Sequence, residues 1–226
     1  MSEVIILAEG ETEKRFVDMV LAPYCAAKGV YLHATKVHSR KHKGMGGGDV
    51  RFSRIRNDVA LFLKQRKDTL VCTFVDFYGT GEWPNLEAAR RQAEPARIAE
   101  LLNAGAVQQM GCECPDIPRM EERYIPFTAV HEFEALLLSN PEILASGLNV
   151  SVAEVQSVVS AAGGPEFVNN SPQTAPSKRL EAWCRQGLKL PYRKTVQGIT
   201  IAREIGIDTM RAQCPLFHAW LLRLGV

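Results

Sequence analysis

Acidic side chains stand at the ends of two apolar stretches of the chain. Val4 to Ala8 is a continuous apolar run that ends at Glu9, and Glu13 follows four residues later. Thr69 to Val75 is a second run of this character, and it ends at Asp76. Carboxylates at such places can bind a divalent cation or transfer a proton. They can equally cap the following helix or complement its dipole, and the spacing alone leaves both interpretations open.

The elements between these acids predict how they are positioned. Apolar residues recur at helical spacing from Phe16 to Tyr24, from Phe52 to Leu63 and from Leu86 to Ala104, and Val30 to Thr35 alternates as a strand. Strands joined by right-handed helical crossovers run parallel, so their carboxyl ends meet at one edge of the sheet. We therefore expect an α/β fold with a mostly parallel sheet flanked by helices, and we expect Glu9 and Asp76 at the same edge.

A third acidic group follows another strand pattern. Arg123 to Phe127 is predicted to be an edge strand because it contains a proline. It leads to His131, Glu132 and Glu134 at the start of an apolar helical pattern. Because His131 and Glu134 are three residues apart, they would share one face of that helix. Both glutamates are candidate metal ligands, and capping of the helix is the alternative interpretation.

A basic segment follows the strand pattern that ends at Thr35. Its cations are Lys36, Arg40, Lys41 and Lys43, and it closes on the glycine run 46–48. Basic side chains and glycine amides suit a phosphate backbone, so we expect these residues to bind nucleic acid. The spacing is not that of a P-loop, and a solvated loop is the alternative. His38 and His42 lack the second ligand pair that a zinc site would need.

Two later segments carry groups that suit bases or phosphates. Phe77 to Pro84 is predicted to be a loop whose aromatic residues could stack on a ligand or contact a partner. Lys178 and Arg179 stand at a predicted helix start after a proline-punctuated loop, where backbone amides and basic side chains can receive phosphate. Simple solvation of both cations is the alternative.

Composition sets the broad class of the protein. The chain has 226 residues, of which 46% are hydrophobic, and a formal net charge of +2. This charge excludes a strongly basic nucleic-acid coat protein but allows binding in a local groove. The six cysteines are scattered, no apolar run reaches about eighteen residues, and the start lacks the basic residues of a signal peptide. We therefore expect a cytoplasmic protein, with an α/β core at residues 1–138 and a helical C-terminal subdomain at 139–226.

Five motifs together resemble one protein family. They are Ala8-Glu9-Gly10-Glu11-Thr12-Glu13, Val75-Asp76-Phe77-Tyr78-Gly79-Thr80, His131-Glu132-Phe133-Glu134-Ala135-Leu136, Pro176-Ser177-Lys178-Arg179-Leu180 and Cys214-Pro215-Leu216-Phe217. This set is similar to the bacterial domain-of-unknown-function family 4276, and the resemblance covers nearly the whole chain. That family is considered similar to the TOPRIM domains of topoisomerases, primases and OLD-type nucleases, so the resemblance implies a TOPRIM-like, Rossmann-like core.

The resemblance also implies roles for particular residues. TOPRIM domains place a glutamate after the first strand and acids after a later strand, around Mg²⁺ or Mn²⁺. Glu9 matches that glutamate, and Glu9 with Glu13 matches the E-x-x-x-E of OLD-type nucleases. Asp76 matches the first acid of the D-x-D motif, whereas Tyr78 stands where the second acid is expected.

The departure at Tyr78 bears on the expected metal chemistry, because one ligand of a two-metal site is missing. Glu132 or Glu134 would supply the missing oxygen, and Lys178 would be the basic residue of an OLD-type site. The catalytic residues expected from the resemblance are then Glu9, Glu13, Asp76 and Lys178.

The expected function is Mg²⁺- or Mn²⁺-dependent cleavage of DNA or RNA. Lys36, Arg40, Lys41, Lys43 and Arg179 would contact the nucleic acid. Relatives often work beside an ATPase in defence against phage, so an ATPase partner and a role in defence are expected too. Two alternatives stay open: a non-catalytic binding or regulatory partner that keeps the fold, and nucleotidyl transfer or ligation at the same acidic edge.

Overall fold

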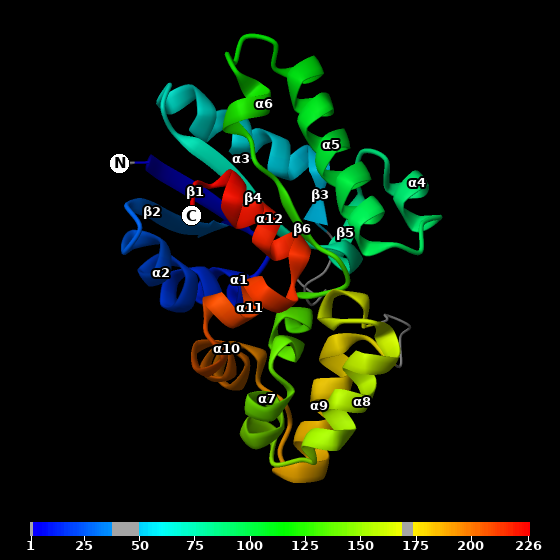
Figure 1. Ribbon diagram of the computed structural model, residues 1–226. Coiled ribbons are helices and arrows are strands. Elements are labelled where there is room, and N and C mark those ends of the chain that lie inside the picture. Colours follow the sequence, from blue (N-terminus) through cyan, green and yellow to red (C-terminus); the bar gives the residue numbers. More distant parts are fainter. Residues whose placement is uncertain (1, 38–49, 169–173) are drawn as a thin grey trace.

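A four-stranded parallel sheet is the centre of the computed structural model, which describes residues 2–37, 50–168 and 174–226 (Figure 1). The strand order is β2-β1-β4-β6, and all three neighbouring pairs are parallel. The strands are β1 (Ser2–Ala8), β2 (Val30–Lys36), β4 (Leu70–Asp76) and β6 (Phe127–Ala129). The expected α/β fold with a parallel sheet flanked by helices is therefore confirmed.

The central strands are buried on both faces because their side chains alternate between two cores. On β1, Val4 and Ile6 enter one core while Leu7 enters the other. On β4, Cys72 and Phe74 lie on the first side, and Val71 and Val75 on the second. This arrangement confirms the burial that the continuous apolar runs predict.

Different helices cover the two faces. The first face packs against a helix made of α1 (Glu11–Phe16), a π-helical turn (Val17–Leu21) and α2 (Ala22–Ala26), and against α10 (Ile199–Ile205), α11 (Ile207–Gln213) and α12 (Pro215–Arg223). The second face packs against α3 (Phe52–Gln65), α4 (Leu86–Arg90), α5 (Pro95–Glu113) and α6 (Met120–Arg123). A two-stranded sheet of β3 (Val50–Arg51) and β5 (Thr80–Glu82) lies beyond this face.

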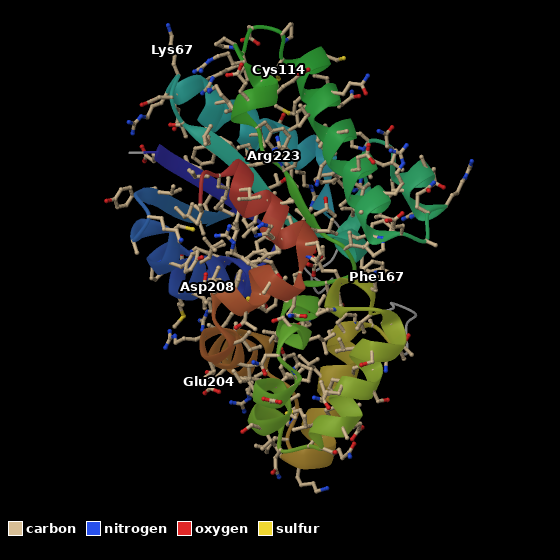
Figure 2. The ribbon with its side chains drawn as sticks, viewed as in Figure 1. Lys67, Cys114, Phe167, Glu204, Asp208 and Arg223 are labelled. Atoms are coloured by element: carbon tan, nitrogen blue, oxygen red, sulfur yellow. The ribbon has the colours of Figure 1, made fainter. Side chains whose placement is uncertain are left out.

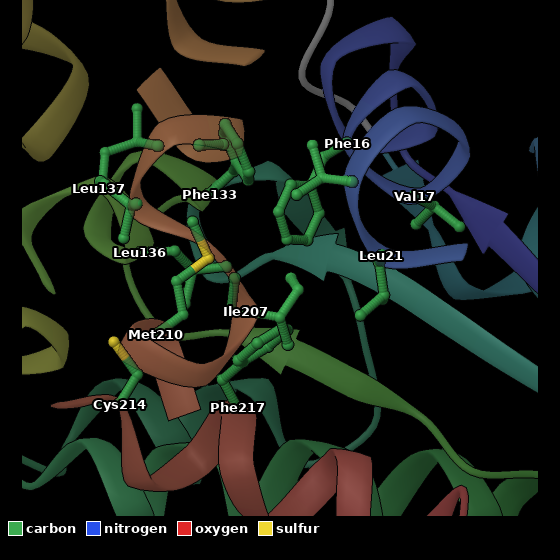
Figure 3. Close-up of a cluster of buried hydrophobic side chains, with 14 of the residues drawn as sticks. Phe16, Val17, Leu21, Phe133, Leu136, Leu137, Ile207, Met210, Cys214 and Phe217 are labelled. Carbon is green, nitrogen blue, oxygen red and sulfur yellow. The ribbon is translucent and has the colours of Figure 1, made fainter. Parts of the chain in front are cut away.

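Aromatic rings from distant parts of the chain meet in the first core. Phe16 lies 5.1 Å from Phe133 and 6.1 Å from Phe217, centroid to centroid (Figure 3). On the sheet itself, the Trp220 ring stacks on Phe127 at 4.7 Å with an interplanar angle of 17°. Helix α12 is thereby fixed to the edge strand β6, about 90 residues earlier in the chain.

Two local predictions are corrected. The predicted helix from Leu86 to Ala104 is two helices, because Pro95 lacks the N–H of a helix interior and instead begins α5. The predicted strand from Arg123 is shorter, since Arg123 belongs to α6 and β6 begins at Phe127. The predicted position of this strand at the sheet edge is confirmed.

Residues 139–226 are mostly helical but occupy two places. Helices α7 (Pro141–Leu148), α8 (Val152–Ala162) and α9 (Pro176–Gly187) form a lobe below the sheet in Figure 1, whereas α10 contacts both α7 and α1, and α12 returns to β6. Four short helical turns complete the chain: η2 (Phe77–Gly79) follows β4, η3 (Phe133–Ser139) precedes α7, η4 (Pro165–Phe167) follows α8, and η5 (Lys194–Gly198) precedes α10 within the described residues. One apolar core runs from the sheet into the lobe, and the division into two domains at residue 138 stays a prediction.

Two expectations from composition can be compared with the structure. All six cysteines are free thiols, and Cys25, Cys72, Cys184 and Cys214 are buried. Within the described residues, no helix combines the length and the apolar character needed to cross a membrane.

Candidate functional site

The carboxyl ends of three parallel strands meet at one edge of the sheet. Glu9 follows β1, Asp76 ends β4, and the loop from Val130 to Glu132 follows β6. The backbone N–H of Asp76 donates to Glu9 Oε2 at 3.0 Å. Asp76 Oδ1 in turn accepts from the backbone N–H of Phe133 at 2.9 Å. The structure thus brings Glu9 and Asp76 together, and hydrogen bonds connect the three strand ends.

Glycine makes the close approach of these segments feasible. A Cβ atom on Gly79 would lie 2.6 Å from Glu9 Cδ and closer still to both carboxylate oxygens. A Cβ on Gly10 would lie 2.9 Å from Glu13 Oε2. Both carboxylates therefore rest directly against backbone, and a larger residue at either glycine would displace them.

Glu13 lies in the first turn of α1, and its side chain is buried. Burial raises the pKa of Glu13, and the neighbouring carboxylate of Glu9 raises it further. The alternative interpretation of this position is an acid that complements the helix dipole. A buried acid beside a second acid departs from that interpretation, because desolvation makes the position unfavourable for charge.

The pKa values of the other two acids shift in the same direction. Burial raises the pKa of Asp76 well above its ordinary value, and the carboxylates of Glu13, Glu9 and Glu134 add to this effect. Asp76 keeps part of its surface exposed, so it is surrounded by protein yet reaches solvent. Burial also raises the pKa of Glu9, against the hydrogen bond from Asp76. The three acids form one mutually repelling cluster.

An ion pair stands beside this cluster. Glu134 is 1% exposed, whereas the Lys194 side chain is 44% exposed, and Lys194 Nζ lies 2.9 Å from Glu134 Oε1. Burial raises the pKa of Glu134, while Lys194 lowers it. Burial alone would lower the pKa of Lys194, but the carboxylates of Glu134, Glu132 and Asp76 raise it above its ordinary value. Lys194 therefore stays charged. It is the first residue of η5, where no motif in the sequence indicates a functional residue.

Glu132 has a different local role. Its Oε2 accepts from the backbone N–H of Ser177 and its Oε1 from the Ser177 hydroxyl, both at 2.8 Å. Ser177 lies in the first turn of α9, where backbone N–H groups lack partners within the helix. Glu132 thus fastens the helical lobe to the sheet edge, and both of its oxygens are already used as acceptors.

Three of the cations nominated from the sequence have partners of their own. Lys178 Nζ lies 3.6 Å from Glu181, with a side chain that is 57% exposed. Arg179 Nε donates to the carbonyl of Thr174 at 2.9 Å. Lys36 forms an ion pair with Glu11 at 3.1 Å, at the carboxyl end of β2. Arg40, Lys41 and Lys43 lie outside the described residues.

His131 connects β6 to this site in an unusual conformation. Its φ angle is +80°, which is uncommon for a residue with a side chain. Burial lowers the pKa of His131 to about 4, so the imidazole is neutral near pH 7. The Tyr78 ring stacks beside it at 6.4 Å. Strained backbone of this kind is common at functional sites, so the conformation of His131 supports a functional site next to the acids.

The oxygen donors of the cluster suit a hard divalent cation. Mg²⁺ prefers carboxylate and water ligands and keeps several of its waters, so few protein ligands suffice. Glu9, Glu13 and Asp76 could supply them. In the chain as described, no group of three or more His, Cys, Asp or Glu side chains is arranged so that it could hold a metal ion as it stands.

Fold and site together define an α/β protein with an acidic cluster at the carboxyl edge of a parallel sheet. The chain belongs to the family described as "Domain of unknown function (DUF4276)", which matches residues 8–225. This range contains the whole acidic cluster and Lys194. No curated protein and no solved structure gives a significant match. The family expected from the motifs is thus confirmed.

Proposed function

We propose that this protein is a Mg²⁺- or Mn²⁺-dependent nuclease of the TOPRIM and OLD type. The observation that carries the proposal is the mutual repulsion of Glu9, Glu13 and Asp76 at the end of the sheet, where each carboxyl has a raised pKa. Such an arrangement is unfavourable for folding on its own, because desolvation and like charge both penalise the ionised acids. Perturbed acids that cluster at a solvent-accessible edge are typical of a functional site.

Each group has a part in the proposed reaction. Glu9, Glu13 and Asp76 would hold the cation through oxygen ligands. A bound divalent cation offsets the charge that develops on the phosphorus oxygens and activates water for attack. Lys194 would donate to a phosphate oxygen and stabilise the transition state, since its ammonium lies among these acids. We prefer Lys194 to Lys178, whose ammonium pairs with Glu181 on the same helix.

Glu132 and Glu134 support the site without supplying the first ligands. Glu134 holds Lys194 in place through their ion pair, and Glu132 holds the start of α9 through Ser177. Both contacts would keep the helical lobe fixed relative to the sheet. Nucleic acid is the proposed substrate. An ATPase partner and a role in defence against phage belong to the same proposal, because the motifs resemble those of TOPRIM and OLD-type proteins.

A specific observation favours one alternative, a non-catalytic partner of an ATPase. Tyr78 replaces the second acid of the D-x-D motif, and its ring is 45% exposed and stacked beside His131. A phenol whose pKa is raised to about 12 by burial and by Glu132 cannot act as an anionic ligand near pH 7. A protein that has lost a ligand in this way could keep the fold and bind without cleaving.

The test combines metal binding with cleavage. Calorimetry would measure Mn²⁺ and Mg²⁺ binding to the wild type and to the Glu9→Gln and Asp76→Asn variants. Cleavage of single-stranded DNA, duplex DNA and RNA would be measured with the same proteins. Asp68→Asn is the matched control, because Asp68 is 79% exposed and does not belong to the acidic cluster. The nuclease proposal expects binding and cleavage by the wild type and the control alone. Metal binding without cleavage of any substrate would favour the non-catalytic partner.

A further inference from the structure

A hollow in the protein surface lies next to the acidic cluster of Glu9, Glu13 and Asp76. Its volume is about 510 Å³, and Phe77, Tyr78, Arg90, His131 and Phe167 contribute to its wall. Phe77 and Tyr78 directly follow Asp76, and His131 directly precedes Glu132. Part of the wall and two of the acidic residues therefore belong to the same two segments. A volume of this size lies in the range of small-molecule sites in proteins.

Aromatic rings give this hollow its character. Tyr78 lies 5.9 Å from Phe77 with the rings inclined by 33°, and 6.4 Å from His131 with the rings inclined by 30°. These near-parallel rings form a platform, and Tyr78 keeps 45% of its surface exposed. Phe167 is 44% exposed and comes from the helical lobe, at its junction with the α/β part (Figure 2). The hollow thus offers aromatic surface from both parts of the molecule.

A cation completes the wall. Arg90 forms an ion pair with Glu87 at 2.9 Å, and both side chains are more than half exposed. Exposed pairs of this kind contribute little to stability, so the guanidinium is free to turn toward a phosphate or a base. An arginine next to stacked aromatic rings is the combination with which proteins bind single-stranded nucleic acids.

We propose that this hollow binds one unpaired nucleobase of the substrate strand by stacking against Tyr78, next to the acidic cluster. The inference rests on the proposed function and deepens it, because it names unpaired nucleic acid as the substrate class. A base inside a duplex has both faces covered by its neighbours, and a protein must extrude it before it can bind it. Single strands, loops and ends present their bases without that cost.

The position of the hollow explains why base and phosphate recognition would be coupled. Tyr78 is one residue from Gly79, which rests on the Glu9 carboxylate, and two residues from Asp76. Glu132 is near enough to the Tyr78 hydroxyl to influence it. A base on the Tyr78 platform would therefore place the adjoining phosphate over Glu9 and Asp76.

The test measures binding without cleavage. The protein is titrated into three labelled ligands, with Ca²⁺ in place of Mg²⁺. The ligands are a fluorescein-labelled oligodeoxythymidine, the same strand with abasic residues, and a duplex of equal length. The variants are Tyr78→Ala, Tyr78→Phe and Phe167→Ala. Tyr31→Ala is the matched control, since Tyr31 is 43% exposed and lies on β2 away from the hollow. Fluorescence anisotropy gives the affinity of each pair.

The expected result has three parts. Tyr78→Ala weakens binding of the single strand by roughly 5- to 150-fold, the range expected for one stacked base. Tyr78→Phe and Tyr31→Ala keep the affinity of the wild type, because both retain the platform. The abasic strand and the duplex bind more weakly than the intact single strand, and Phe167→Ala also weakens binding of that strand.

Other outcomes overturn the inference. They are equal affinity for the intact and abasic strands, equal affinity of Tyr78→Ala and wild type, a preference for the duplex, or no binding of any strand. The two proposals fail separately. Metal-dependent cleavage that Tyr78→Ala and abasic residues leave unchanged would retain the nuclease and remove the base site. Base-dependent binding without any cleavage would retain the base site and remove the nuclease.

Discussion

Gly79 and the carboxylate of Glu9 are in direct contact, so that a Cβ on Gly79 would lie 2.6 Å from Glu9 Cδ. This contact joins the turn after β4 to the residue after β1. It requires glycine for reasons of space, because Gly79 is not among the glycines with a positive φ angle. The most direct test of the site is therefore to add a single methyl group at Gly79, by substituting alanine.

Gly79→Ala is expected to displace the Glu9 carboxylate and abolish metal binding. Overpacking of this kind costs about 1–3 kcal/mol in the free energy of unfolding. Calorimetry with Mn²⁺ and chemical denaturation measure the two effects. Gly111→Ala is the control, because a Cβ there meets no atom within 4 Å and alanine favours the helix. Unchanged metal binding by Gly79→Ala would show that Glu9 is not a ligand.

Asp76→Asn is expected to stabilise the metal-free protein while removing metal binding. The amide keeps an acceptor for the N–H of Phe133, and it eliminates a charge that burial and three neighbouring carboxylates oppose. We expect the free energy of unfolding near neutral pH to rise by roughly 1 kcal/mol, as for other substitutions at strained functional sites. Denaturation in EDTA measures the change. A loss of stability would instead mark Asp76 as a structural cap.

The contribution of the acidic cluster to the stability of the metal-free protein is expected to fall as the pH rises through the raised pKa values of its acids, whereas the lowered pKa of His131 has the opposite effect below about pH 6.5. The acids of the cluster have raised pKa values, so between the unfolded and folded pKa values the folded state holds more protons. Their stabilising contribution is complete below the unfolded pKa and is lost as the pH rises through the folded one. Thermal unfolding in EDTA at several pH values tests this sign.

Two comparisons separate the sources of that pH dependence. Glu166, whose pKa burial raises to about 7, accepts from the backbone N–H groups of Leu216 and Phe217. Glu166→Gln should remove the part of the decline between about pH 4.5 and 7. Added Mg²⁺ should reduce the part due to the cluster, since a cation that binds the ionised acids stabilises the folded state. Stability in EDTA that rises with pH above about 6.5, where His131 is neutral in the folded and the unfolded chain, would contradict the raised pKa values.

Lys194→Met is expected to affect both stability and function, whereas Lys178→Met should affect neither. Without Lys194, the buried carboxylate of Glu134 loses its counter-charge. We expect a loss of about 1–3 kcal/mol where Glu134 is ionised and a smaller loss at lower pH, where Glu134 takes up a proton. The exposed pair of Lys178 with Glu181 is worth less than about 1 kcal/mol. Equal effects of the two substitutions would remove the role proposed for Lys194.

The central strands and two of the acids could be predicted because their signals are local. An apolar run that ends in a carboxylate predicts both the strand and the end at which the acid lies, so the meeting of Glu9 and Asp76 at one sheet edge follows from the sequence. The helix break at Pro95 was also visible in the sequence but was outweighed by the apolar pattern on either side. The edge position of β6 followed from its proline.

Lys194 could not be found in this way. It lies about 60 residues after Glu134, and only the return of the chain from the helical lobe brings the two together. Lysines at helix starts look alike in the sequence, so nothing separated Lys178 from Lys194. The same holds for Glu132, whose bond to Ser177 depends on how the lobe docks. Spacing within one segment carries no information on such contacts.

The stack of Trp220 on Phe127 has a consequence for how the protein is made. Ribosomes add about 5–20 residues per second, so the roughly 90 residues between these rings take about 5–20 s to synthesise. During that interval the apolar face of β4 and β6, with Phe74 and Phe127, has no α12 to cover it. The nascent chain is therefore a natural client for chaperones that bind exposed apolar strands, until Trp220 has left the ribosome.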